Sequence, residues 1–176
     1  MKKKRTSRPR TPEREIYLVR HAIAEERGPK WPDDRKRPLT GKGIERMREV
    51  VRGLRELAIA FDTVLSSPLV RAKDTAHILV GGMKPQPMIT LLPALAPGTS
   101  PAQAGRAIQA YRQARRIAVV AHEPGLGELA AWLIGAKKPF ELKKGGVCRI
   151  DVAGPVAAGK GRLVWLAPPG LLRKIS

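Results

Sequence analysis

The sequence predicts an α/β protein, a three-layer α/β/α sandwich built around a mostly parallel central sheet. Short apolar runs alternate with segments whose apolar residues recur at helical spacing, which is the pattern of that fold class. The runs are apolar on both faces, as expected for parallel strands covered by helices on both sides. With 176 residues, of which 43% are hydrophobic, the chain is long enough to bury one substantial core.

Residue type and spacing predict the first secondary-structure elements. The run EIYLVR (15–20) is short and apolar, so it predicts a buried strand. The polar segment 22–39 contains one glycine and three prolines and is expected to be a loop. A helical stripe follows over 39–58 with Thr40 as its N-cap, and FDTVLSS (61–67) predicts the second strand.

The remaining elements continue the alternation. The next helix is expected to have Ser67 as its N-cap and Pro68 at its first position, where the missing N–H is harmless. After it we predict, in chain order, a strand near 88–92, a helix over 101–114, a strand over 116–122, a helix opening at Pro124 and two strands within GGVCRIDVAG and GRLVWLAPP.

The formal net charge of +19 is divided unequally along the chain. Residues 1–14 carry seven lysines and arginines against one glutamate, contain two prolines and lack apolar periodicity. They predict a disordered basic tail in front of a single domain over 15–176. Because a basic field attracts nucleic acid, anionic membrane and phosphorylated partners alike, charge alone selects no function.

The sequence shows no membrane or secretory signal. No apolar run approaches the roughly 20 residues that span a bilayer, and no apolar segment follows the basic N-terminus. Cys148 is the one cysteine and cannot form an internal disulfide, so it is expected to be buried filler. These features predict a cytoplasmic protein that does not act at a membrane.

Three predicted strands end in residues suited to chemistry. The first ends at Arg20 and His21, the second is followed by Arg71 in the next helix, and the strand over 116–122 leads to His122 and Glu123. Ligands of open α/β sheets bind beyond the carboxyl ends of the strands, so these side chains should converge. Guanidinium groups and helix N-termini favour a tetrahedral anion such as phosphate.

The two histidines suggest the reaction. An imidazole between fixed cations resists protonation, so His21 would keep a free nitrogen with which to attack phosphorus. His122 would donate a hydrogen bond to the transferred phosphoryl group, and water would release phosphate in a second step. Each motif alone has an ordinary structural explanation, and it is their order and common placement that carry the hypothesis.

Four segments, LVRHAIAE, RPLTGKG, LSSPLVRAKDTA and VVAHEPGL, together resemble the histidine phosphatase superfamily over about residues 15–167. The RHAxAE form and the short chain are most similar to the SixA-type phosphohistidine phosphatases. The resemblance implies a phosphoglycerate mutase-like fold, His21 as the phosphorylated nucleophile and a phosphate pocket completed by Arg20, Arg71 and His122. It also implies that no metal or organic cofactor is needed.

Glu123 is the one obvious candidate for a general acid. One branch of the superfamily places an acid directly after the second histidine, where Glu123 stands, and other members carry a glutamate where this chain has Ala94. Glu123 has a second reading, as a carboxylate at the positive end of a helix. Since imidazole leaves phosphorus more easily than an alkoxide, a site without a dedicated acid predicts phosphohistidine in a protein as substrate rather than a sugar phosphate.

Other functions remain open at this stage. A broad phosphomonoesterase of the same superfamily would use the same residues on small phosphorylated substrates. A nucleic-acid-binding protein on a degenerate phosphatase fold is motivated by the charge, but aromatic residues make up only 4% of the chain, too few for many stacking platforms. A mutase is disfavoured by the short chain and by Ala94. Arg27 is a further candidate for the phosphate pocket, and His77 is expected to be an ordinary helical residue.

Overall fold

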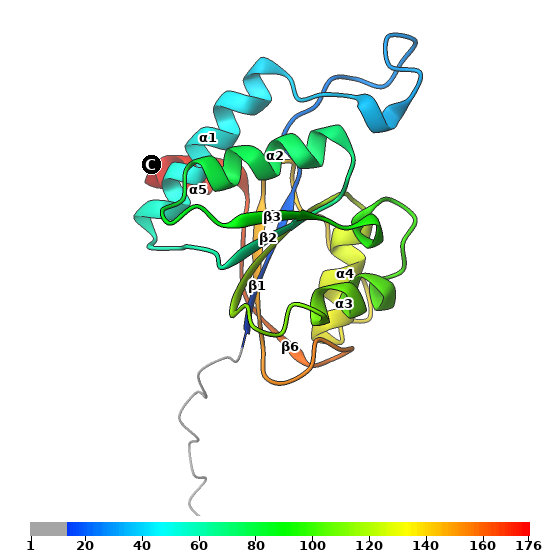
Figure 1. The fold of residues 1–176 in the computed structure, drawn as a ribbon, viewed down its shortest axis with the longest axis vertical. Coiled ribbons are helices and arrows are strands. Elements are labelled where there is room, and N and C mark those ends of the chain that lie inside the picture. The colour runs from blue at the N-terminus through cyan, green and yellow to red at the C-terminus, as the bar shows by residue number, and fades with distance from the viewer. Residues whose placement is uncertain (1–13) are drawn as a thin grey trace, which may run out of the picture.

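The computed structural model describes residues 14–176 (Figure 1). The strands are β1 (Arg14–Arg20), β2 (Thr63–Ser66), β3 (Met88–Leu91), β4 (Arg116–Ala121), β5 (Val147–Val152) and β6 (Gly161–Ala167). The α-helices are α1 (Gly41–Glu56), α2 (Val70–Gly81), α3 (Pro101–Gln109), α4 (Gly125–Ile134) and α5 (Pro169–Ile175), and the short 3-10 helices are η1 (Asp34–Lys36) and η2 (Pro93–Leu95).

The basic tail predicted over 1–14 lies outside the described residues, apart from Arg14. The first strand begins at Arg14, one residue earlier than predicted. Arg14 pairs with Val152 of β5, and its guanidinium donates a hydrogen bond to the Gln109 side chain at 2.8 Å. These two contacts extend the strand beyond the apolar run that is visible in the sequence.

The six described strands form one sheet in the order β3-β2-β4-β1-β5-β6. Neighbours from β3 to β1 are parallel, β5 is antiparallel to β1, and β6 is antiparallel to β5. The prediction of a mostly parallel sheet is therefore confirmed. Because β4 lies between β1 and β2, the carboxyl ends of these three strands meet at one edge of the sheet.

Helices cover both faces of the sheet, which confirms the three-layer arrangement (Figure 1). On one face α1, α2 and α5 contribute buried side chains such as Met47, Leu79 and Leu172. On the other face α3 and α4 contribute Ile108 and Leu129. Full burial of an apolar side chain of this size stabilises a fold by roughly 1.5–3 kcal/mol, so these two clusters hold the sheet that positions the strand ends.

The start of α1 is as predicted and that of α2 is not. The Thr40 hydroxyl accepts a hydrogen bond from the Gly43 N–H at 2.9 Å, which confirms it as the N-cap of α1. The prediction that Ser67 caps the next helix is wrong, because α2 begins at Val70 and its N-cap position is Leu69. The Ser67 hydroxyl instead accepts from the Leu69 N–H within a turn and contacts a histidine, as described below.

Helix α3 is shorter than predicted. α3 ends at Gln109 rather than near residue 114, because the chain then turns into β4, where Asp62 accepts the N–H groups of residues 115 and 116.

Helix α5 was not predicted. It packs against α1, where Gly53 allows the close approach, since a Cβ there would collide with the Leu172 carbonyl. None of the helices within residues 14–176 is long and apolar enough to cross a membrane.

Candidate functional site

The pairing of β1 with β4 brings the two predicted histidines together. Arg20 lies opposite Ala121 in the parallel register, so His21 and His122 follow paired positions on adjacent strands. The His21 N–H also donates to the Ala121 carbonyl at 3.1 Å. The two imidazole rings lie 5.1 Å apart between centroids, tilted by 53°, and both side chains are buried.

The backbone fixes which nitrogen of His21 is free. Its Nδ1 lies 2.7 Å from the carbonyl oxygen of Ala22, and since a carbonyl only accepts, Nδ1 carries the hydrogen. The Nε2 lone pair is then left for other chemistry. The Ala22 N–H donates to the hydroxyl oxygen of Thr75, whose O–H donates to the Arg71 carbonyl. Thr75 therefore ties the segment that orients His21 to helix α2.

Ser67 contacts the imidazole of His122. Its hydroxyl oxygen lies 2.8 Å from Nε2 of His122 and accepts the N–H of Leu69 at 3.3 Å. The described residues offer the Ser67 O–H no other acceptor, so we assign its proton to Nε2, which leaves the hydrogen of the neutral ring on Nδ1. Nδ1 of His122 is buried and has no hydrogen-bond partner among the described residues. A donor is thereby presented beside His21.

Both histidines are held neutral. Burial is the main cause that lowers the pKa of His21 to about 4, and the nearby Arg71, Arg20 and Arg37 guanidinium groups lower it further. Burial also lowers the pKa of His122 to about 3, with His21 and Arg71 as further causes. At neutral pH, His21 therefore keeps an unprotonated nitrogen among fixed positive charges.

A cluster of arginines surrounds Asp34 of η1. Buried Arg71 contacts the Asp34 carboxylate at 3.0 Å and donates to its carbonyl at 2.8 Å, while Arg37 binds the same carboxylate at 2.8 Å. Arg37 also donates to the Glu25 carbonyl at 2.6 Å. Arg27, considered for the phosphate pocket, pairs with Asp34 at 3.2 Å but has a side chain that is 77% exposed. Three guanidinium groups share one carboxylate, so the cluster stays positive.

Sequence reasoning did not identify Asp34 or Arg37 as parts of this cluster. Arg37 opens the segment RPLTGKG, which was noticed only as part of a family resemblance. The signal was the run DDRKR in a loop expected to be irregular, where η1 forms instead. A buried arginine needs a partner, and Asp34 provides it.

Arg20, the last residue of β1, reaches the segment that precedes β5. Its Nη1 donates to the Glu141 carboxylate at 2.7 Å and to the Leu142 carbonyl at 2.6 Å. The Gly145 N–H donates a hydrogen bond shared between the carbonyls of Arg20 and His21, at 3.1 and 3.2 Å. This segment therefore braces the end of the first strand from outside the sheet.

Unpartnered nitrogen atoms gather at this site. Among residues 14–176 the buried side-chain nitrogens without a hydrogen-bond partner are Arg20 Nε, Trp31 Nε1, Arg71 Nε and His122 Nδ1. Three of them belong to the residues predicted to hold a phosphate. Buried donors are normally satisfied in proteins, so an anion that accepts from all three would meet their requirement.

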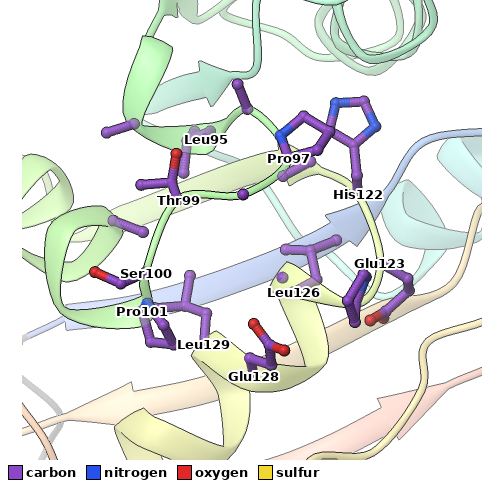
Figure 2. A pocket seen from close by; sticks show the side chains of 17 residues that line it. Leu95, Pro97, Thr99, Ser100, Pro101, His122, Glu123, Leu126, Glu128 and Leu129 are labelled. Atoms are coloured by element: carbon purple, nitrogen blue, oxygen red, sulfur yellow. The ribbon is translucent and has the colours of Figure 1, made fainter. Parts of the chain in front are cut away.

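Glu123 has a structural part in this arrangement. Its two carboxylate oxygens accept the N–H groups of Gly127 at 3.1 Å and Leu142 at 2.9 Å. Burial raises the pKa of Glu123, and the two N–H donors oppose that rise. In Figure 2 the Glu123 carboxylate and the His122 ring project in different directions. The carboxylate thus links the start of α4 to the segment that Arg20 contacts.

The histidine phosphatase superfamily (branch 1) model matches residues 16–96, the part of the chain that contains Arg20, His21 and Arg71. The chain belongs to the histidine phosphatase superfamily. The protein is accordingly a phosphatase. An uncharacterized protein of Picosynechococcus sp. is 34% identical over 138 residues, which cover 76% of this chain and 82% of that protein.

Two solved structures show how widely the fold of this phosphatase is shared. The protein histidine phosphatase SixA complexed with tungstate superposes with a TM-score of 0.79 at 23% identity, over 89% of this chain and 97% of that chain. The alpha-ribazole phosphatase from Shigella flexneri gives 0.69 at 20% identity, over 88% and 96%. The phosphoglycerate mutase-like fold predicted from the sequence is confirmed.

A cavity of about 390 Å³ opens beside His122 in this phosphatase (Figure 2). Its walls are the segment 94–101, the end of β4 and the start of α4. Ala94, Leu95 and Leu126 make this surface largely apolar, and Glu128 lies at the end away from the His122 ring in Figure 2. The cavity has room for the group attached to a bound phosphate.

The remaining singled-out residues lie away from this site. His77 is exposed on α2, as expected of an ordinary helical residue. Cys148 is fully buried in β5, and burial raises the pKa of its thiol to about 12, so it behaves as the predicted filler. Within the described residues there is no group of three or more histidine, cysteine or acidic side chains that could hold a metal ion.

Proposed function

We propose that the protein is a phosphohistidine phosphatase that works through a phosphorylated intermediate on His21. The observation that carries this proposal is the placement of a neutral His21 beside three buried, unpartnered donors on Arg20, Arg71 and His122. A neutral imidazole is a nucleophile, and the donors supply hydrogen bonds for the charge that develops on the phosphoryl oxygens.

In the first step the Nε2 lone pair of His21 forms a bond to phosphorus as the P–N bond of the substrate breaks. The other nitrogen of the substrate ring is protonated before this bond breaks, so the ring leaves with the bonding electron pair as neutral imidazole. Nδ1 of His21 keeps its hydrogen and donates it to the Ala22 carbonyl. With a hydrogen on Nδ1 and a phosphoryl group on Nε2, the ring is cationic and is itself a good leaving group. Water then attacks phosphorus, releases phosphate and a proton, and restores neutral His21.

We propose a substrate with a P–N bond because the site lacks a general acid to protonate the leaving group. Ala94 offers no proton in the wall of the cavity, and both oxygens of Glu123 are already bound by backbone N–H groups. Glu128 lines the far end of the cavity. General acid catalysis is typically worth ~10²–10⁴ in rate, so leaving groups that need an acid are disadvantaged here by about that factor.

Kinetics on two substrate classes test this proposal. We expect kcat/KM for a phosphohistidine peptide to exceed that for a sugar phosphate by about 10² or more, the usual contribution of a missing acid. His21→Asn should abolish both activities, while the exposed His77→Asn variant should retain them. A large preference for the sugar phosphate would instead assign the site to a broad phosphomonoesterase. The cavity beside His122 is the observation that favours that second candidate, because it accommodates a small organic leaving group.

A further inference from the structure

A second cavity, of about 460 Å³, adjoins the same strand end. It lies between α1, the segment 143–145 and α5, and Arg20 forms part of its wall. We call it the basic cavity, after the five cations that line it: Arg20, Arg46, Lys143, Lys144 and Arg173. Because Arg20 also contributes to the phosphate site, a ligand in the basic cavity lies next to a substrate bound at His21.

The basic cavity has more positive charge than its own carboxylates neutralise. Arg173 pairs with Glu49 and Arg20 with Glu141, each at 2.7 Å. The ion pairs within residues 14–176 include none with Arg46, Lys143 or Lys144. Three unpaired cations around one concave surface attract anions and favour their association.

The floor of the basic cavity is apolar. Ile23 and Pro169 line it with half-buried side chains, and beneath them lie the buried side chains of Ala22, Met47 and Val50. A bare inorganic anion makes no use of such a floor, whereas an acidic peptide places its carboxylates on the rim and its aliphatic groups on the floor. The lining contains no aromatic ring on which a nucleic acid base could stack.

We propose that the basic cavity binds an acidic segment of the phosphorylated protein substrate, beside the phosphohistidine that enters the active site. This inference rests on the proposed function and names a feature of its substrate: aspartate or glutamate residues close in space to the phosphohistidine. The attraction between rim cations and these carboxylates raises the rate of encounter and fixes the orientation of the substrate, and it weakens as salt screens the charges.

The test compares two phosphohistidine peptides of equal length, one with acidic residues flanking the histidine and one with glutamine and asparagine in their place. We expect the wild-type enzyme to favour the acidic peptide in kcat/KM by about 10-fold, a ratio typical of a few rim charge pairs. The variant Arg46→Glu/Lys144→Glu should lose this preference and keep its turnover of phosphoramidate, which is too small to reach the cavity.

A matched control has the same change in charge elsewhere. Lys137 and Lys138 are exposed after α4 and do not line the basic cavity, so Lys137→Glu/Lys138→Glu should keep the preference. An equal loss in this control would mean that overall charge, not the cavity, selects the peptide, and would overturn the proposal. Equal kcat/KM on the two peptides in the wild-type enzyme would overturn it as well.

Binding separates this inference from the proposed function. Fluorescence anisotropy with the unphosphorylated acidic peptide should show binding that the Arg46→Glu/Lys144→Glu variant loses. If that binding is seen but no phosphohistidine is hydrolysed, the proposed function fails and the acidic-segment site stands. If single-stranded RNA binds in place of the peptide and the same variant loses it, the cavity belongs to nucleic acid and the inference is overturned.

Discussion

His21 and His122 occupy equivalent positions on two neighbouring parallel strands, one residue beyond the paired Arg20 and Ala121. Their rings lie 5.1 Å apart between centroids and are both kept neutral by burial. The sheet thus places a free nitrogen lone pair and a free N–H donor side by side.

Ser67→Ala should lower kcat by about 10-fold or more, because without the serine proton the hydrogen of His122 can return to Nε2 and leave Nδ1 without a donor. Nitrogen NMR of the labelled imidazole would show the tautomer directly. Ser66→Ala is the matched control, since the Ser66 hydroxyl is equally buried but donates to the Ser67 carbonyl. A drop in kcat for Ser66→Ala as large as that for Ser67→Ala would rule out this role.

Glu123→Gln should lower stability more than it alters chemistry, because a glutamine amide keeps one acceptor oxygen for the two N–H donors that Glu123 now binds. The loss of a buried hydrogen bond of this kind costs roughly 1–3 kcal/mol. Any fall in kcat should be the same for p-nitrophenyl phosphate and for an alkyl phosphate. A loss confined to the alkyl phosphate, whose leaving group needs a proton, would identify Glu123 as a general acid.

Ala94→Glu should raise an activity that is weak in the wild-type enzyme. Ala94 lines the cavity beside His122, so a carboxyl group there can protonate a leaving oxygen. We expect kcat/KM on alkyl phosphates to rise by about 10-fold or more, with little change on phosphohistidine. Ala94→Gln has the same size without the proton and should give no gain. Equal gains in the two variants would point to binding of the leaving group rather than acid catalysis.

Acidification should destabilise the protein before its carboxylates titrate. Histidine in an unfolded chain has a pKa near 6.5, whereas burial lowers the pKa of His21 to about 4 and that of His122 to about 3. As the pH falls from 6.5 toward 5, these histidines therefore bind protons in the unfolded state but not in the folded state, and the free energy of unfolding decreases. Each histidine contributes up to about 1.4 kcal/mol per pH unit to that slope.

Urea unfolding at a series of pH values measures this slope. His21→Asn should reduce it by close to one proton. A His21→Asn variant with the wild-type pH dependence would mean that His21 is not held neutral by the fold.

The sequence was sufficient to predict the histidine pair because apolar runs mark buried strands, and strand ends carry ligands in this fold class. Arg20, His21 and His122 all follow from that rule. The register that sets His21 beside His122 depends on the pairing of strands far apart in the sequence. The sequence predicts that the two side chains converge but not which residues of the two strands pair. Asp34 could not be anticipated, because its contact with Arg71 spans 37 residues and depends on how the loop folds back onto α2.

Ser67 and Glu123 show a different limit of sequence reasoning. Both residue types are common at helix starts, and the local sequence predicts Ser67 as an N-cap and Glu123 as either a carboxylate at the positive end of a helix or a general acid. In the fold, Ser67 contacts His122 from the neighbouring strand, and Glu123 binds the N–H of Leu142, which lies 19 residues away. Local propensity cannot distinguish a cap from such a tertiary contact.

The most direct test of the account is to trap the intermediate. The enzyme should be mixed with a phosphohistidine peptide or phosphoramidate, quenched rapidly under alkaline conditions that preserve phosphohistidine, and digested to map the phosphoryl group by mass spectrometry. We predict a phosphoryl group on Nε2 of His21, absent from His21→Asn, which should also lack turnover. A phosphoryl group on any other residue, or turnover that persists in His21→Asn, would contradict the account.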